Sequence, residues 1–195
     1  MNIIKNGLTL IGALSIAAIL WGLYLIEPVY HRFSSFDDKA FETYQSLVKN
    51  ILETGNAAEA TVWKMQVDDG LKAAEVEEVM RFVANEHNIK NVGELPLYKQ
   101  VEASTGKPFR FMKIYMFCNA LTAAKMVRYS DAFSAYLPCR VALLEDKTGK
   151  LWLYSLNMDL MIYGGTPLPD ELKKEALNVK KIILDIMKRG ASGEF

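Results

Sequence analysis

Residues Gly7–Ile26 read GLTLIGALSIAAILWGLYLI, and no charged side chain interrupts them. A helix needs roughly 20 apolar residues to cross the hydrocarbon core of a bilayer. The stretch therefore predicts a single membrane-spanning helix, and we place the anchor at residues 7–27, where Glu27 and Pro28 end the apolar run. Aromatic and basic side chains near its end suit the membrane–water interface; we assign Trp21, Tyr24, His31 and Arg32 to it.

Two other interpretations of this segment remain open. Residues Met1–Lys5 resemble the positive start of a cleaved signal peptide. However, the apolar region of a signal peptide runs roughly 7–15 residues, and no small-x-small cleavage site follows Ile26. A core helix of a soluble domain would normally carry a polar face, which this segment lacks. We therefore favour an uncleaved anchor.

The charged residues on either side of the anchor bear on which end of it lies in the cytoplasm. Lys5 precedes the apolar run, whereas Arg32 and Lys39 follow it among acidic residues. Counting Lys and Arg does not decide the direction, but a short positive tail before a long apolar run is typical of a signal-anchor. We expect a single-pass protein of the inner (cytoplasmic) membrane with its N-terminal tail, residues 1–6, inside and its folded domain in the periplasm.

The remaining sequence is that of an ordinary water-facing domain. The chain has 195 residues, with 23 Lys and Arg balanced by 23 Asp and Glu. A nucleic-acid-binding protein is expected to carry a basic stripe. The nearest candidate, Lys173–Lys174 with Lys180–Lys181, is expected on a solvated helix face. We therefore exclude nucleic acid as a partner.

An amphipathic stalk helix is expected at residues 36–55. Asp37 or Asp38 can cap its start, and Gly55 ends it. Its apolar residues recur at helical spacing: Phe41, Tyr44, Leu47, Val48, Ile51 and Leu52. We expect the stalk to pack on the domain or on a partner.

Residues 57–190 predict a small α+β domain, followed by a loose tail at 191–195. The sequence predicts an antiparallel or mixed sheet with helices packed on one face. Residues 95–102 remain ambiguous, because Pro96 disfavours a central strand. The expected strands are 61–67, 109–117 (buried on much of both faces), 137–144 and 151–156, and the expected helices start near Asp69, Asn119 and Asp170.

Two motifs resemble those of a known family. MFCNALTAA at Met116–Ala124 precedes YLPCRVALLED at Tyr136–Asp146, and Asn157-Met158-Asp159 supplies a third segment. Together they resemble the DUF302 family over about residues 57–189. Ala120 departs from the usual proline, the region 96–108 is longer than usual, and the anchor and stalk are additions. The resemblance implies a small α+β domain with homodimers among its relatives, and it supplies no catalytic residues.

The cysteines are the main candidates for chemistry. Cys118 is expected to end one strand and Cys139 to begin another, and adjacent strands could bring them together as a disulfide or redox pair. They could equally be buried free thiols. Thiols and thioethers suit Cu(I), so Cys118 and Cys139 with Met112 and Met116 form a candidate metal site, although methionines are more often core filler.

Few other residues suggest a cofactor or catalysis. The chain has no Cys-x-x-Cys-His, so covalent c-type haem is excluded on motif. Non-covalent haem through His87 or a methionine remains open. Asp159 is expected to cap a helix rather than act as a catalytic acid. No phosphate loop, dinucleotide fingerprint or metalloprotease motif is present. We assign no cofactor, with copper and haem as the alternatives.

These observations favour a membrane-anchored, non-enzymatic interaction domain. Its expected partners are membrane lipid and either other membrane subunits or a second copy. We expect an accessory subunit of a larger membrane complex, such as a respiratory or oxidoreductase complex. The alternative is a periplasmic redox or metal (copper or haem) domain that uses Cys118 and Cys139. A third hypothesis is a small-molecule sensor with a pocket between sheet and helices.

Overall fold

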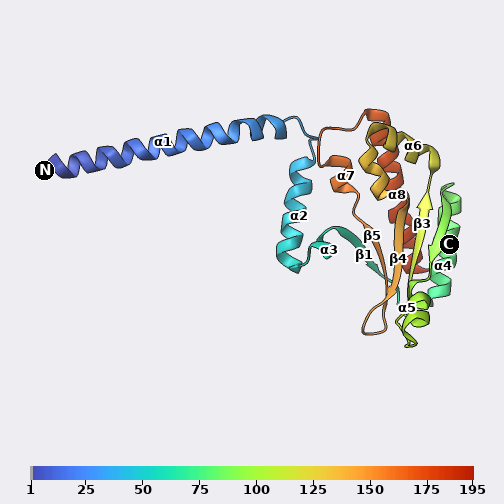
Figure 1. Ribbon diagram of the computed structural model, residues 1–195. Coiled ribbons are helices and arrows are strands. Elements are labelled where there is room, and N and C mark those ends of the chain that lie inside the picture. The colour runs from blue at the N-terminus through green and yellow to red at the C-terminus, as the bar shows by residue number, and fades with distance from the viewer. Residues whose placement is uncertain (1) are drawn as a thin grey trace.

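The computed structural model describes residues 2–195, with side chains from Ile11 onward. A long N-terminal helix precedes a five-stranded sheet and its covering helices (Figure 1). The elements are α1 (Asn2–Phe33), α2 (Ala40–Thr54), α3 (Ala57–Ala60), β1 (Val62–Gln66), α4 (Ala73–Glu86), β2 (Lys90–Leu95), α5 (Leu97–Thr105), β3 (Met112–Cys118), α6 (Ala120–Tyr129), the 3-10 helix η1 (Asp131–Tyr136), β4 (Cys139–Glu145), β5 (Leu151–Leu156), α7 (Asp159–Tyr163) and α8 (Asp170–Ser192).

The sheet has the order β1-β5-β4-β3-β2, and every neighbouring pair is antiparallel. The predicted α+β class is therefore confirmed. The β4–β5 hairpin turns at Gly149, whose φ of +83° favours glycine. Beside it, the Asp146 carboxylate accepts hydrogen bonds from the backbone N–H groups of Thr148 and Lys150 and from Nε1 of Trp152. This local network fixes the register of the hairpin.

One face of the sheet forms the core. Successive residues in a strand point to opposite faces; Tyr115 and Phe117 of β3 are fully buried, whereas Met112, Ile114 and Met116 are only half-buried. The prediction that this strand is buried on much of both faces is met in part: α4 and α8 bury one face fully, and the other face is half-buried. Each fully buried large side chain contributes roughly 1.5–3 kcal/mol. The core also includes Val76, Met80, Val83, Val141, Leu143, Leu153, Ile183, Ile186 and Met187.

A glycine allows α8 to approach α4 and the sheet closely. A Cβ atom added at Gly190 would lie 2.8 Å from Cγ of Met80 in α4 and 3.4 Å from Cδ1 of Leu153 in β5. Three elements therefore meet at a point where even a methyl group would be crowded. This contact sets the height of α8 above the sheet.

A partly buried charge network ties α4 to the sheet. Nζ of Lys113 in β3 lies 2.9 Å from Glu77 and 2.7 Å from Glu94, and Arg81 bonds the same two carboxylates at 3.0 and 2.9 Å. Burial acts to raise the pKa of Glu94, but hydrogen bonds from Lys113 and Arg81 outweigh it and lower that pKa. The network aligns α4 with β2 and β3.

The region between β2 and β3 differs from the sequence-based expectation. Strand β2 is not among the strands expected from the sequence, and it pairs with β3 through a register shift between Asn91 and Gly93. The ambiguous segment is helical, as α5, and Pro96 sits at its N-cap. Proline is tolerated there, because the backbone N–H groups of the first turn have no partner within the helix.

The expected helix caps had mixed outcomes. Asn119 caps α6 as predicted, since its Oδ1 accepts hydrogen bonds from the backbone of Leu121 and Thr122. Asp37 caps the start of α2 in part, since its Oδ1 accepts a hydrogen bond from the backbone N–H of Lys39 at 3.1 Å, although Lys39 is the N-cap residue. The caps predicted at Asp69 and Asp159 were wrong, because Lys72 and Met158 are the N-cap residues of α4 and α7. Glu75 supplies a carboxylate to the N-cap of α4, and Asp37 and Asp159 also form ion pairs with lysines of α8.

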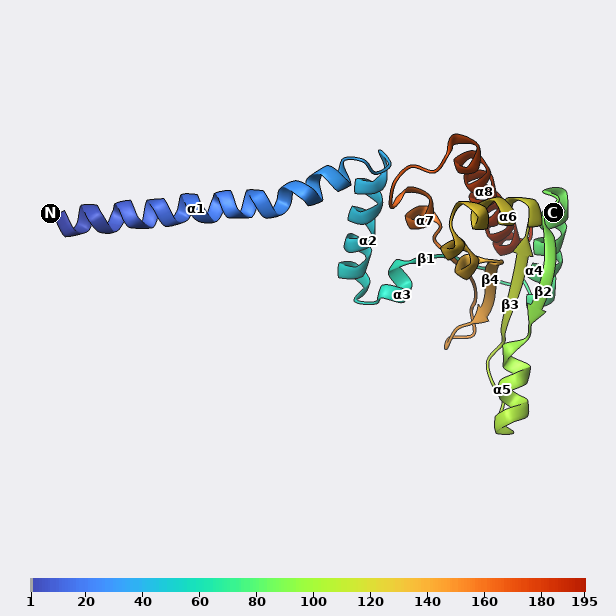
Figure 2. The same cartoon turned by 45° about the horizontal axis from the view of Figure 1, so that its top comes forward.

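The N-terminal helix projects away from the domain. Its segment Ile11–Phe33 is long and apolar enough to span a membrane, and none of it is buried. This exposure rules out the core-helix interpretation. The sequence predicted that the apolar run ends at Glu27 and Pro28, but the helix continues past Pro28 and ends at Phe33. Figures 1 and 2 show α2 running crosswise to α1, on the side of the domain from which α1 projects.

The Gly190 contact makes a direct prediction about Gly190→Ala. Alanine normally stabilises a helix interior by about 1 kcal/mol relative to glycine, but overpacking a core typically costs 1–3 kcal/mol. We expect the free energy of unfolding to fall by about 1 kcal/mol in chemical denaturation of the full chain. Lys188→Ala, an exposed change in the same helix, serves as the control and should alter stability by less than about 0.5 kcal/mol. A more stable Gly190→Ala protein would contradict the close contact.

Candidate functional site

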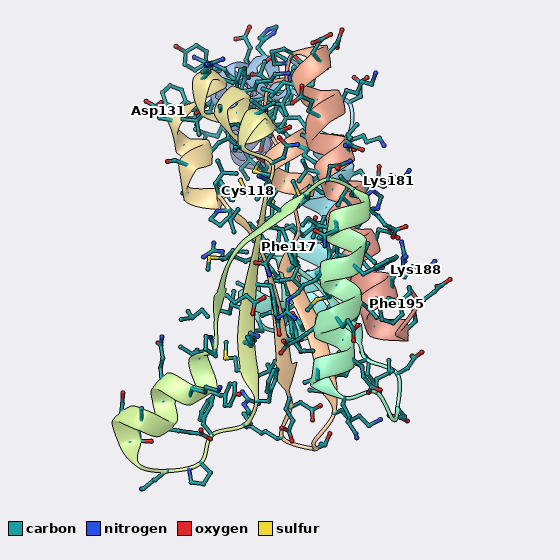
Figure 3. All side chains as sticks on the ribbon, turned by 90° about the vertical axis from the view of Figure 1, so that its right-hand side faces the viewer. Phe117, Cys118, Asp131, Lys181, Lys188 and Phe195 are labelled. Atoms are coloured by element: carbon teal, nitrogen blue, oxygen red, sulfur yellow. The ribbon has the colours of Figure 1, made fainter. Side chains whose placement is uncertain are left out.

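The candidate site lies at the end of the sheet where β3 finishes and β4 begins. Figure 3 shows Cys118 at this end of β3, beneath α6 and η1. An apolar cavity of about 40 Å³ opens there. Its lining brings together five sulphur-bearing side chains: Cys118, Met126, Cys139, Met158 and Met161.

The two cysteines occupy the strand ends at which the sequence placed them. Phe117, rather than Cys118, is paired directly with Cys139 in the β3–β4 register. Because adjacent residues in a strand point to opposite faces, the one-residue offset works against a disulfide. Both residues are free thiols in the structure. The cavity lies where the strands end, so both side chains can line it.

The surroundings of the thiols keep them protonated. Burial raises the pKa of Cys118. Burial, followed by the neighbouring Cys118, raises the pKa of Cys139 to about 11. The thiolate is the reactive form of cysteine and also the form that binds metals. The site is therefore one of low intrinsic nucleophilicity, and a metal bound there would have to displace protons.

The predicted metal ligands are only partly brought together. Met112 and Met116 lie in β3 opposite Leu144 and Arg140, and strand alternation puts them on the face opposite to Phe117. Met126, Met158 and Met161 line the cavity in their place. Among the described residues, no group of three or more His, Cys, Asp or Glu could hold a metal ion.

The size of the cavity limits what it can hold. A volume of about 40 Å³ is close to the space of one water molecule, roughly 30 Å³. A single soft ion such as Cu(I) fits the sulphur donors, but a porphyrin does not fit. His87, the other residue considered for haem, bonds Asp185 of α8 through Nε2 at 2.7 Å.

A second hollow separates α2 from the domain. This cleft, of about 430 Å³, is lined by α2, the residues just before β1, α7 and Lys180 of α8. Thr43, Asn50, Thr61 and Asn157 give it polar walls. The sensor hypothesis expected a pocket between sheet and helices, whereas this larger space lies between the stalk helix and the domain.

The lysines at the edge of this cleft surround one aromatic ring. The ammonium groups of Lys39, Lys173 and Lys180 lie 5.3, 5.5 and 5.8 Å from the ring centroid of Tyr163. Lys173 also pairs with the buried Asp37, and Lys180 pairs with Asp159. Of the four lysines expected on a solvated helix face, Lys174 and Lys181 are exposed, whereas Lys173 and Lys180 are half-buried in these ion pairs.

Comparison with known proteins identifies the domain. Residues 63–189 match the family model described as "Domain of unknown function DUF302". The chain belongs to the DUF302 family. No curated protein matches the sequence. The match begins within β1, so α1 and α2 precede it.

A solved structure supports the fold of the DUF302 domain. The crystal structure of an uncharacterized conserved protein DUF302 from Bacillus stearothermophilus is similar, with a TM-score of 0.53. The similarity covers 66% of this chain and 97% of that chain, at 16% sequence identity. At this identity the comparison bears on the fold alone. The shared part is the sheet with its helices.

One residue that lines the DUF302 cavity, Met126, had no signal in the sequence, whereas Met158 belongs to the Asn157-Met158-Asp159 segment. Met126 and Met158 are buried in a second apolar cluster with Ile162, Tyr163 and Leu172. Their helical or loop positions resemble those of ordinary core residues. Their approach to Cys139 depends on how α6 and α7 fold over the end of the sheet.

The raised thiol pKa values predict slow alkylation. At pH 8 a thiol with a pKa of about 11 is only about one-thousandth ionised, whereas a free cysteine with a pKa of about 8.5 is substantially ionised. We expect iodoacetamide to label Cys139 on the order of a hundredfold more slowly in the folded chain than in denaturant. Measurement on a Cys118→Ser variant isolates this thiol. Equal rates in the two states would contradict a buried, protonated Cys139.

Proposed function

We propose that the chain is a membrane-anchored, non-enzymatic interaction domain that serves as an accessory subunit of a larger membrane complex. In this proposal α1 is an uncleaved anchor in the inner membrane, and the DUF302 domain lies in the periplasm. The support comes from the exposed apolar surface of the chain and from the chemistry of its buried groups. The partner is a second membrane subunit.

The observation that carries the proposal is the open face of the sheet. The face away from the α4–α8 core bears a shallow hollow of about 290 Å³. Its walls are mainly apolar: Val62, Ile114, Ala142, Tyr154, Leu156 and Met161 line it. Contiguous apolar surface of this kind marks protein interaction sites.

The anchor gives the choice of partner a physical basis. A domain tethered to a bilayer meets other proteins of that bilayer at a raised effective concentration. Modest apolar contacts, too weak to hold a soluble complex, are then sufficient. A membrane subunit whose periplasmic part presents an apolar segment at the same height would fit the hollow.

The ionisable groups favour a structural over a catalytic role. Lys180 and Asp159 at the cleft neutralise each other, and Lys173 neutralises Asp37. The two thiols have raised pKa values, the opposite of what an activated nucleophile requires. These pairs are better suited to holding α2, α7 and α8 together than to proton transfer.

Purification from the native membrane tests the proposal. We expect the full chain, extracted in mild detergent, to carry a membrane subunit in stoichiometric amount by mass spectrometry. Ala142→Asp puts a charge in the middle of the open face, so it should abolish co-purification. The matched control is Lys147→Asp in the exposed β4–β5 turn, which should leave it intact. Recovery of the wild-type chain alone, or only with copies of itself, would refute the accessory-subunit proposal.

A second candidate function is soft-metal binding at the end of the sheet. The specific observation is that two thiols and three thioethers line one small apolar cavity. Such donors select Cu(I). In this alternative the loss of two thiol protons accompanies binding, so affinity rises with pH.

Copper binding is tested by competition with a Cu(I) chelator. If the alternative holds, the folded chain takes up one Cu(I), and Cys118→Ser and Cys139→Ser each weaken binding by at least about tenfold. Met112→Leu, on the opposite sheet face, is the control and should have no effect. Uptake that is unchanged in both cysteine variants, or the absence of uptake, would remove this function.

A further inference from the structure

Helix α2 carries more apolar surface than its contact with the domain uses. With 3.6 residues per turn, Ala40, Tyr44 and Leu47 fall on one side; Ala40 is buried, and the other two are half-buried. Oη of Tyr44 donates a hydrogen bond to the carbonyl of Gly164 at 2.5 Å. This side is the packed side of α2.

A second apolar stripe lies about a third of a turn away. Phe41, Val48 and Leu52 share it, and they are 65%, 54% and 80% exposed. A hollow of about 500 Å³ runs along this stripe. The remaining sector carries the charges Glu42, Lys49 and Glu53. The helix therefore has one side for the domain, one for water, and one apolar side that no described element covers.

The position of α2 relative to α1 suggests what covers this stripe. Both views show α2 crosswise to α1, at the side of the domain from which α1 projects (Figures 1 and 2). The candidate span ends at Phe33, and α2 begins at Ala40. If α1 crosses a bilayer, α2 therefore runs along its surface at the height where the span ends. The apolar surface of the anchor then continues into α2.

The short connection holds α2 in that position. The backbone N–H of Asp37 donates to the carbonyl of Gly165 at 2.9 Å, and the carboxylate of Asp37 pairs with Lys173. Burial acts to raise the pKa of Asp37, but the hydrogen bonds from Lys173 and from the backbone of Lys39, together with the charges of both lysines, outweigh it and lower that pKa. The carboxylate therefore stays charged and bonded at neutral pH. The start of α2 is fixed to the domain rather than free to swing.

We propose that α2 is an interfacial helix whose Phe41–Val48–Leu52 stripe inserts into the lipid surface around the anchor. This inference rests on the proposed membrane anchoring and adds a second lipid contact to it. An amphipathic helix lying in the interface plane buries its apolar side at the headgroup boundary. Because α2 has a single basic residue, Lys49, a neutral phosphatidylcholine surface is sufficient. The stripe and α1 together fix the orientation of the domain above the membrane.

Site-specific photocrosslinking tests this proposal on the full chain in phosphatidylcholine vesicles. A benzophenone amino acid is placed at Leu52 in the stripe, at Ser46 on the side of α2 that lines the cleft as matched control, and at Ile19 in α1. We expect lipid adducts at Leu52 and Ile19, and several-fold fewer at Ser46. The adducts at Leu52 should persist in high salt, because the contact is apolar.

The probe positions distinguish the proposed interfacial helix α2 from the proposed membrane anchor α1. Lipid adducts at Ile19 with none at Leu52, or with adducts of Leu52 to a second copy, would overturn the interfacial helix and leave the anchor intact. Absence of lipid adducts at Ile19 would overturn the proposed anchoring and, with it, this inference. Equal lipid labelling at Ser46 and Leu52 would also overturn it, since labelling would then not depend on the stripe.

Discussion

The burial of one sheet face under α4 and α8 is the constraint on which the rest of the molecule depends. Gly190 lets α8 sit close to Met80 and Leu153, and the Glu77–Arg81–Glu94–Lys113 network aligns α4 over β2 and β3. Because both helices share one face, the other face of the sheet keeps its apolar side chains half-exposed. The end of β3 and the start of β4 are covered by α6, η1 and α7, and the small sulphur-lined cavity forms beneath them.

Local patterns predicted most of the elements but not the way they pair. The hairpin around Gly149, the Asn119 cap and α8 follow from turn chemistry, side-chain capping and helical periodicity, which are readable over short windows. Strand β2 was missed, because its register shift at Asn91–Gly93 interrupts the alternation that marks a strand. Pro96 is compatible with either the edge of a strand or the start of a helix, so only pairing with β3 decides between them.

The candidate site was predicted in the same partial way. Cys118 and Cys139 could be placed at strand ends from sequence, because the aromatic run before one and the Leu-Pro before the other limit the strands. Strand alternation puts Met112 and Met116 on the same face as Cys118 but on the face opposite to Phe117, the partner of Cys139. Neither methionine lines the cavity. The methionines that do line it come from α6 and from the segment after β5, and no spacing rule connects those segments. The charge pattern of the sequence also did not predict the ion pair between Asp37 and Lys173, because these residues are far apart in sequence and meet only through tertiary packing.

The two apolar sides of α2 connect the fold to the proposed role. A helix that only packed on the domain would need one apolar side, and a free stalk would not be bonded through Asp37 and Tyr44. With α1 in a bilayer and the second stripe on its surface, the domain is attached at two places rather than one, which restricts its rotation about the anchor. The open sheet face would then be held at one height and in one direction. A partner in the same bilayer would find it by searching in two dimensions, and part of the entropic cost of association would already have been met.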